Sequence, residues 1–180
     1  MSRDLIVVDL ETTGLGPAIH KILEVAAVNT STGEVIHFVP DIDPADLGIA
    51  DGYAMQTNRY YERGVWKHKL SHEASREQYE RLSDMLRGNT FAGSNPRFDA
   101  NFLTRSWSTF FDPEPWHHRL ADLSAYAAGA LGIAPNELVG LGDICARLDV
   151  NPGVAHSALD DAKATAECFR KLANLRGGTK

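Results

Sequence analysis

The chain opens with a short apolar run, residues 5–8, that leads directly into two carboxylates, Asp9 and Glu11. A continuous run of this kind is typical of a strand that is buried on both faces of a sheet. Because side chains alternate across a strand, Asp9 and Glu11 share one face if the strand continues through Glu11. Two like charges at the end of a buried strand repel each other and resist desolvation unless a cation joins them. The run therefore predicts a carboxylate site for a hard divalent metal ion.

The same two acids have a simpler explanation, because Asp and Glu often mark the point where a strand meets solvent. The Thr-Thr-Gly that follows Glu11 is a turn signal and does little to separate the two interpretations. A metal site needs further ligands, and these must come from other parts of the chain.

Length, composition and charge restrict the class of protein. A chain of 180 residues is long enough for one domain with a substantial core, and 43% hydrophobic with 23% charged residues is typical of a soluble globular protein. The apolar run near the N-terminus is too short for a signal peptide or a membrane span, so we expect a cytoplasmic protein with no membrane partner and a single domain over residues 1–180. A net charge of -6 argues against a passive nucleic-acid-coating protein but not against a metal-dependent nuclease. Cys145 and Cys168 are interpreted as reduced packing residues, because their spacing suggests no zinc site.

The hydrophobic patterns predict strands that are followed by alternating helices and short strands. The first run and two further strands, at residues 21–28 and 34–40, are expected to form an antiparallel meander. Two short strands are expected at 90–93 and 118–120, and helices at 72–87, from 96 onward, and at 123–131, 141–148 and 157–175.

Residues 41–71 follow no regular pattern, and a connection of this length usually holds small helices or serves function. Basic and aromatic residues alternate within it at 58–69. They could contact a nucleic-acid backbone and stack on bases. Alternatively, a short amphipathic helix packs the Tyr and Trp side chains on the body of the protein, and the sequence does not decide between these two interpretations.

A helix is predicted to start at Asn95 and Pro96, with Asn95 as the N-cap and Pro96 at the first helical position. Asp99 then lies in the first turn, beside Phe98. A negative charge near a helix N-terminus is favourable, so a structural role would explain Asp99. The functional alternative is that this helix directs Asp99 toward the carboxylates of the first strand.

The closing helix offers two acids, Asp160 and Asp161, which helical geometry separates. At about 100° per residue, one face is predicted to be buried and to contain Leu159, Ala162, Ala166, Phe169, Leu172 and Ala173. Asp160 lies on the opposite face, where it is expected to pair with Lys163 or Lys171. Asp161 lies at the margin of the buried face and is the acid predicted to point at a site. His156 precedes this helix and is the best candidate for a general base.

Together these residues resemble the DnaQ-like 3′–5′ exonucleases of the DEDDh group. The first motif of that group, Asp-x-Glu followed by Thr-Thr-Gly, matches residues 9–14, and Asn-x-x-x-Asp matches residues 95–99. The third motif, His-x-Ala-x-x-Asp, matches residues 156–161, and residues 20–25 resemble the second strand of the group. The resemblance implies an α/β protein with a ribonuclease H-like three-layer fold, in which helices flank a central mixed five-stranded sheet.

The resemblance also implies a mechanism. Two divalent cations, Mg²⁺ or Mn²⁺, would be held by four carboxylates, Asp9, Glu11, Asp99 and Asp161. One cation would lower the pKa of the attacking water and the other would stabilise the leaving 3′ oxygen. His156 would accept the proton of the water, and nucleoside 5′-monophosphates would leave from the 3′ end. Thr12 and Leu15 would border the terminal nucleotide, with Leu15 as a wedge beneath its base.

The substrate is less constrained. Residues 9–14 resemble the proofreading branch of the group more than the short-oligoribonucleotide branch, so we expect single-stranded or 3′-terminal DNA to be favoured over RNA. A 3′–5′ exoribonuclease is the alternative. The chain ends soon after its last helix with no recognisable polymerase-binding tail, so we expect a stand-alone enzyme, although a small polymerase-binding surface is compatible with the sequence.

Two rival functions remain for this pattern. A catalytically silent nucleic-acid-binding module is disfavoured, because all four acids and the histidine are present and the chain is acidic. A metal-dependent phosphatase or other phosphoryl hydrolase that acts on small molecules would need only the carboxylates. The resemblance favours the exonuclease over both.

Overall fold

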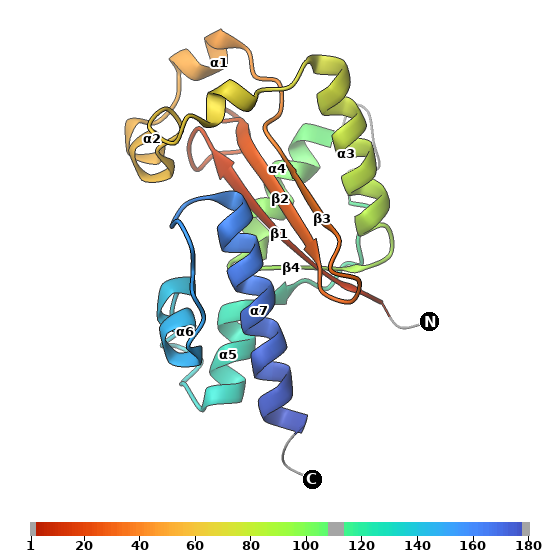
Figure 1. Ribbon diagram of the computed structural model, residues 1–180, viewed down its shortest axis with the longest axis vertical. Coiled ribbons are helices and arrows are strands. Elements are labelled where there is room, and N and C mark those ends of the chain that lie inside the picture. Colours follow the sequence, from red (N-terminus) through yellow and green to blue (C-terminus); the bar gives the residue numbers. More distant parts are fainter. Residues whose placement is uncertain (1–2, 108–113, 178–180) are drawn as a thin grey trace.

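The structure is a computed structural model and describes residues 3–107 and 114–177. Within these ranges, no helix combines the length and the apolar character that a membrane span requires. The described residues form a central sheet with helices on both of its faces (Figure 1).

The sheet is mixed and contains five strands in the order β3-β2-β1-β4-β5, as predicted. The strands are β1 (Leu5–Thr12), β2 (Ile22–Asn29), β3 (Val35–Phe38), β4 (Thr90–Gly93) and β5 (Ala121–Asp122). The first three form the predicted antiparallel meander, and β4 and β5 are added in parallel on the other side of β1. The central strand β1 is thus covered on both edges, which explains its apolar sequence.

The last strand is displaced from its predicted position at 118–120. Ala121 and Asp122 form it, because they pair with Ala92 and Gly93 of β4. The carboxylate of Asp122 then accepts a hydrogen bond from the Ala125 N–H and caps the next helix. One acid therefore ends the strand and starts the helix, which leaves no loop between them.

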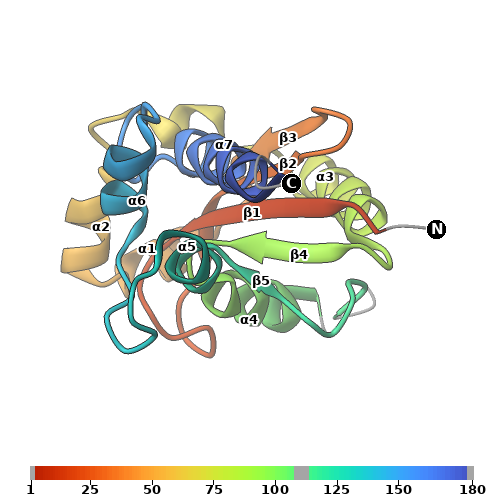
Figure 2. The ribbon, with the colours of Figure 1, turned by 90° about the horizontal axis from the view of Figure 1, so that it is seen from below.

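Two helical layers complete the core. The helices α3 (His72–Leu86) and α4 (Pro96–Trp107) pack on one face of the sheet, against the side chains of Ile6, Val8 and Leu10. The opposite face, which includes Val7, is covered by α5 (Leu123–Leu131), α6 (Leu141–Leu148) and α7 (Ala158–Gly177). In Figure 2, α5 and α7 lie in front of the strands and α3 lies behind them.

The closing helix buries a wider surface than the predicted stripe. Ala162, Phe169 and Leu172 are buried as predicted, whereas Leu159 and Ala166 are only partly buried and Ala173 is exposed. The helix contacts β1, β2, α5 and α6, so residues on both sides of the stripe are covered as well: Ala158, Ala164, Thr165 and Cys168. Cys145 and Cys168 are free and buried between α6 and α7, with their Sγ atoms 3.6 Å apart, in agreement with the predicted packing role.

The irregular segment 41–71 holds three short helices, α1 (Pro44–Gly48), α2 (Gly52–Asn58) and the 3₁₀ helix η1 (Val65–His68). Tyr60 is buried in a small separate cluster with Leu23, Val39, Ile42 and Val65. Tyr61 and Trp66 stay 54% and 48% exposed. Packing on the body therefore explains Tyr60, but it does not explain the exposed aromatic side chains.

The start of α4 agrees with the prediction in position but not in capping geometry. The helix begins at Pro96, where proline fits without losing a hydrogen bond. Asn95 has φ 66°, in the left-handed region, rather than the extended backbone typical of an N-cap residue. Its carbonyl accepts the Phe98 N–H at 3.0 Å. The chain thus turns sharply from β4 into α4.

Candidate active site

A cavity of about 240 Å³ lies where β1 ends, and all of the residues predicted to act in catalysis or substrate binding line it. These residues are Asp9, Glu11, Asp99, Asp161, His156, Thr12 and Leu15. They come from the end of β1 and the loop after it, from the first turn of α4, and from the start of α7 with the loop before it. Residues that are far apart in sequence are therefore brought to one place by the fold.

Asp9 and Glu11 share one face of β1, the face that Leu5 and Val7 present to the layer of α5 and α7. Both acids are half-buried. Burial, with the charges of Asp99 and Glu11, raises the pKa of Asp9 well above its usual range. Burial and the nearby acids Asp161 and Glu24 raise the pKa of Glu11 to about 8.

Asp99 is only 4% exposed and is tied to the strand. Its Oδ1 accepts the Leu10 N–H at 3.0 Å, which holds the first turn of α4 against β1 between the other two acids. Burial raises the pKa of Asp99 well above its usual range, although the backbone N–H of Leu10 opposes this effect. A charged Asp99 is therefore disfavoured here unless a further positive charge lies close to it.

The two acids at the start of α7 point to different surroundings. Asp161 faces the cavity, and its carboxylate accepts the His156 N–H at 3.0 Å. Asp160 lines a separate groove and accepts the Val154 N–H at 3.0 Å. The structure thus places Asp161 at the cavity and Asp160 away from it, as the helical geometry predicts, and the role of Asp161 stays a prediction.

The predicted ion pair of Asp160 is wrong for the described residues. Lys171 instead donates to the carbonyls of Leu148 and Asp149, at 2.8 and 2.7 Å. These carbonyls lie at the C-terminal end of α6, where a cation is favourable. Lys171 thereby joins α7 to α6.

His156 lies on the loop before α7, with its backbone in the left-handed region (φ 58°) and its side chain exposed. One nitrogen of its ring, one oxygen of Glu11 and one oxygen of Asp161 lie within 4.8 Å of one another. The histidine is thus close enough to the acids to exchange a proton with a molecule bound between them.

One wall of the cavity comes from the irregular segment, through α2. Asn58, at the end of this helix, is buried and donates from Nδ2 to the Thr12 carbonyl at 3.1 Å. The Asn58 carbonyl accepts the Nε–H of Arg63 at 2.8 Å, and Nη2 of Arg63 lies 2.5 Å from Glu24 Oε2. A chain of contacts therefore connects β2, the irregular segment and the end of β1.

Glu24 is the cross-strand neighbour of Glu11 and is 3% exposed. Burial would raise its pKa, but hydrogen bonds from His37 (2.9 Å) and Arg63 outweigh burial, and the net effect lowers it. Sequence reasoning missed Glu24 and Arg63 as neighbours of the site. A charged residue inside the apolar run 22–28 was the available signal, since a buried acid requires a partner.

The donor set fits divalent cations. Buried carboxylates with raised pKa values lie together, and their oxygens are the ligands that hard divalent cations prefer. Arg63 lowers the pKa of Glu11 and Asp161 to some extent, but it is already paired with Glu24. The ionised cluster would therefore carry an excess of negative charge that bound cations would neutralise.

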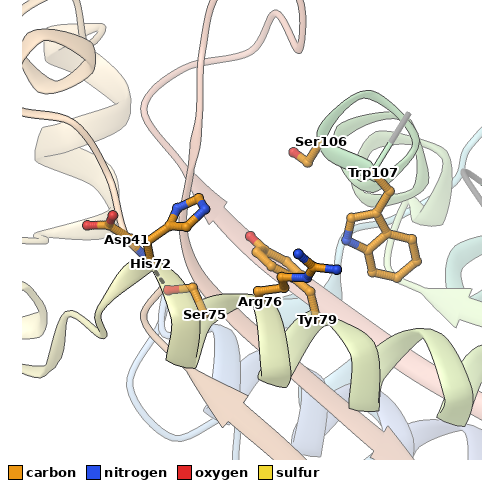
Figure 3. Close-up of a pocket in the computed structure, with 7 residues that line it drawn as sticks. All are labelled: Asp41, His72, Ser75, Arg76, Tyr79, Ser106 and Trp107. Carbon is orange, nitrogen blue, oxygen red and sulfur yellow. Dashed lines mark hydrogen bonds between the residues drawn. The ribbon is translucent and has the colours of Figure 1, made fainter. Parts of the chain in front are cut away.

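A second cavity, of about 170 Å³, opens between α3 and α4 (Figure 3). Arg76 and Tyr79 of α3 lie between His72 at one end and Trp107 of α4 at the other. Its one carboxylate, Asp41, is paired with Lys69 at 2.7 Å. The described residues that line this cavity include no cluster of acids and no residue of β1, so the cavity at the end of β1 stays the candidate active site.

The chain thus has a ribonuclease H-like fold: a three-layer α/β arrangement with acids gathered at the end of its central strand. The model of the RNase T exonuclease family matches residues 6–169. The chain therefore belongs to this exonuclease family, and the resemblance to the DEDDh exonucleases is confirmed.

Individual relatives agree with this assignment. The chain is 26% identical over 171 residues to a PolC-type DNA polymerase III of Thermotoga petrophila, an alignment that covers 94% of this chain but 12% of the relative. Among solved structures, the zinc-bound complex of E. coli ExoI with single-stranded DNA matches with a TM-score of 0.75 and 22% identity, over 97% of this chain and 41% of ExoI. The nuclease domain of 3′hExo, a DEDDh family member bound to rAMP, matches with a TM-score of 0.70 and 15% identity, over 98% of this chain and 93% of that domain.

Proposed function

We propose that the chain is a 3′–5′ exonuclease that releases nucleoside 5′-monophosphates from the 3′ end of nucleic acid. The observation that carries this proposal is the convergence of four carboxylates and a histidine on one cavity: Asp9, Glu11, Asp99, Asp161 and His156. Membership of the exonuclease family supports the reaction class. A small-molecule phosphatase would need only the carboxylates, but it would not explain why the cavity is bordered by an exposed leucine.

Two divalent cations, Mg²⁺ or Mn²⁺, would be held by the four carboxylates. When bound, such cations activate a water molecule and stabilise the charge on the leaving oxygen. Asp99 brings its carboxylate to the strand through the Leu10 N–H, and Asp161 is oriented by the His156 N–H. These hydrogen bonds hold the ligands in place before any cation arrives, which reduces the reorganisation that binding requires.

His156 is proposed as the general base. Its side chain is exposed at the margin of the cavity, so the ring can accept a proton from a water molecule at the acids and pass it to solvent. The hydrogen bond from its backbone to Asp161 fixes the loop rather than the ring. The ring therefore stays free to turn toward the substrate.

Thr12 and Leu15 are proposed to border the terminal nucleotide. The Leu15 side chain is 78% exposed at the cavity. An apolar side chain in this position contributes hydrophobic free energy only when a ligand covers it and removes it from water. Thr12 is buried, and its hydroxyl donates to the Gly14 carbonyl at 2.8 Å. Thr12 thus shapes the backbone that presents Leu15.

We propose single-stranded or 3′-terminal DNA as the preferred substrate, with RNA as the alternative. The DNA complex of ExoI supports the first choice, and the rAMP complex of 3′hExo supports the second. The PolC-type relative supports a polymerase partner. We further propose that residues 1–180 act as a single exonuclease domain, and a cytoplasmic location stays a prediction from the sequence.

The test uses 5′-labelled single-stranded DNA and RNA of the same sequence, each incubated with Mg²⁺, Mn²⁺ or EDTA. We expect a ladder that shortens from the 3′ end, faster on DNA than on RNA, absent in EDTA and absent with Asp9→Ala. Faster cleavage of RNA would overturn the DNA preference alone. If neither polymer is cut in either metal, the exonuclease proposal is wrong.

A further inference from the structure

The loop between β1 and β2 carries Leu15, and the backbone of this loop decides where Leu15 lies. Leu15 is 78% exposed, so little packing of its own fixes the side chain. The loop is closed at its base, where the Thr13 N–H donates to the Lys21 carbonyl at 2.8 Å. The Lys21 N–H in turn donates to the Thr13 hydroxyl at 2.9 Å. These contacts fix the two ends of the loop but not its middle.

His20 holds the middle of the loop. Its Nδ1 accepts the Gly16 N–H at 3.1 Å, and its own N–H donates to the Gly16 carbonyl at 2.8 Å. The residue next to Leu15 is therefore bonded to His20 through both backbone groups. Because Nδ1 accepts this hydrogen bond, the neutral ring carries its proton on Nε2.

The imidazole ring also packs directly on Gly14, on the other side of Leu15. A Cβ added at Gly14 would lie 2.5 to 2.6 Å from three atoms of the His20 ring, closer than any real side chain allows. The ring thus occupies the space that a side chain at residue 14 would need. Gly14 and Gly16, which flank Leu15, are both held by one half-buried histidine.

We infer that His20 is a positioning residue for substrate binding, which sets the place of Leu15 through the loop. His20 does not line the catalytic cavity, so it acts through Leu15 rather than on the reacting groups. The inference rests on the proposed exonuclease function, because Leu15 matters only if a nucleotide occupies the cavity. A residue that serves only the fold would change stability without changing substrate affinity.

Three substitutions separate the two contributions of the ring. His20→Asn keeps an acceptor near the position of Nδ1 but removes the ring from Gly14. His20→Phe keeps a ring of similar shape but removes the acceptor. His20→Ala removes both, and His118→Ala serves as the matched control, because His118 is an exposed histidine outside this loop whose ring lies beside that of His117.

Steady-state hydrolysis of a single-stranded DNA oligonucleotide is measured for each variant, together with its melting temperature. We expect His20→Ala to raise KM about tenfold, the factor that corresponds to about one net hydrogen bond, with kcat within about twofold of wild type. His20→Asn and His20→Phe should each raise KM by less. His118→Ala should match wild type.

A double-mutant cycle tests whether the effect passes through Leu15. In a Leu15→Ala background, His20→Ala should raise KM by less than about twofold further, because the side chain that it positions is gone. Fully additive effects of the two substitutions would overturn the inference, as would an unchanged KM in an active His20→Ala. If His20→Ala fails to fold, the same cycle is run with His20→Phe. An inactive wild-type protein would instead refute the exonuclease function itself.

Discussion

Without divalent cations, the protein is expected to lose stability as the pH rises from about 5 to above 8. Burial, with Asp161 and Glu24, raises the pKa of Glu11 to about 8, from an ordinary value of 4.5. The folded state therefore binds this proton more tightly than the unfolded state. The stabilisation is fully present below about 4.5 and is lost progressively as the pH rises through about 8.

The size of the effect follows from this interval. At about 1.36 kcal/mol per pH unit, the interval from 4.5 to about 8 corresponds to on the order of 4 to 5 kcal/mol of unfolding free energy. For a protein of this size, 1 kcal/mol changes the melting temperature by roughly 2 to 4 °C. We therefore expect the melting temperature in EDTA to fall by roughly 10 °C or more. The raised pKa values of Asp9 and Asp99 act in the same direction.

The assay is thermal unfolding followed by circular dichroism, in EDTA and in MgCl₂, across this pH range. Saturating Mg²⁺ should remove the fall, because a cation that binds only the folded state offsets the repulsion. The matched control is Glu11→Gln, which should melt at a higher temperature than wild type in EDTA at high pH and should show a shallower dependence. The comparison is the melting temperature of wild type minus that of Glu11→Gln, both in EDTA. If this difference stays constant or rises with pH, the electrostatic reasoning is refuted.

Three further predictions concern single residues near the site. Asp161→Asn should lose nearly all exonuclease activity while Asp160→Asn stays within about twofold of wild type, because Asp161 faces the cavity and Asp160 does not. The reverse pattern in a gel-based assay would contradict the assignment. His156→Ala should lower kcat by about 10²- to 10⁴-fold, whereas the rise in melting temperature on adding Mg²⁺ should persist. A His156→Ala variant that turns over substrate as fast as wild type would show that His156 is not the general base. Arg63→Met should cost about 3 kcal/mol in urea unfolding, because it removes one of the two ion-pair partners of the buried Glu24. A cost below about 1 kcal/mol would show that His37 compensates.

Local patterns were sufficient to predict much of the fold. The helices at 123–131 and 141–148 occur at their predicted bounds, because each is short, periodic and delimited by turn residues. The apolar run of β1 required a central strand, and the structure covers it on both edges. Helical spacing also predicts that Asp161 rather than Asp160 faces the site, and the structure places Asp161 at the cavity.

Contacts between distant segments could not be predicted in the same way. Asn58 and Thr12 are 46 residues apart, and Arg63 and Glu24 are 39 residues apart. No local periodicity encodes such pairs, because their partners meet only after the sheet has formed. For this reason the sequence does not predict where the irregular segment lies, although its helix α2 lines the cavity that holds the acids. The left-handed Asn95 was missed because sequence favoured an ordinary capping residue there.

The most direct test of the central claim is to identify the first product released from a defined DNA strand. A single-stranded oligonucleotide with a label on its 3′-terminal phosphodiester is incubated with the protein in Mg²⁺, and the products are separated at early times. We predict that the 3′-terminal nucleoside 5′-monophosphate is released first, and that Asp9→Asn and EDTA both prevent its release. Internal fragments, release from the 5′ end, or undiminished activity of Asp9→Asn would contradict the assignment of the carboxylate cluster as a 3′–5′ exonuclease site.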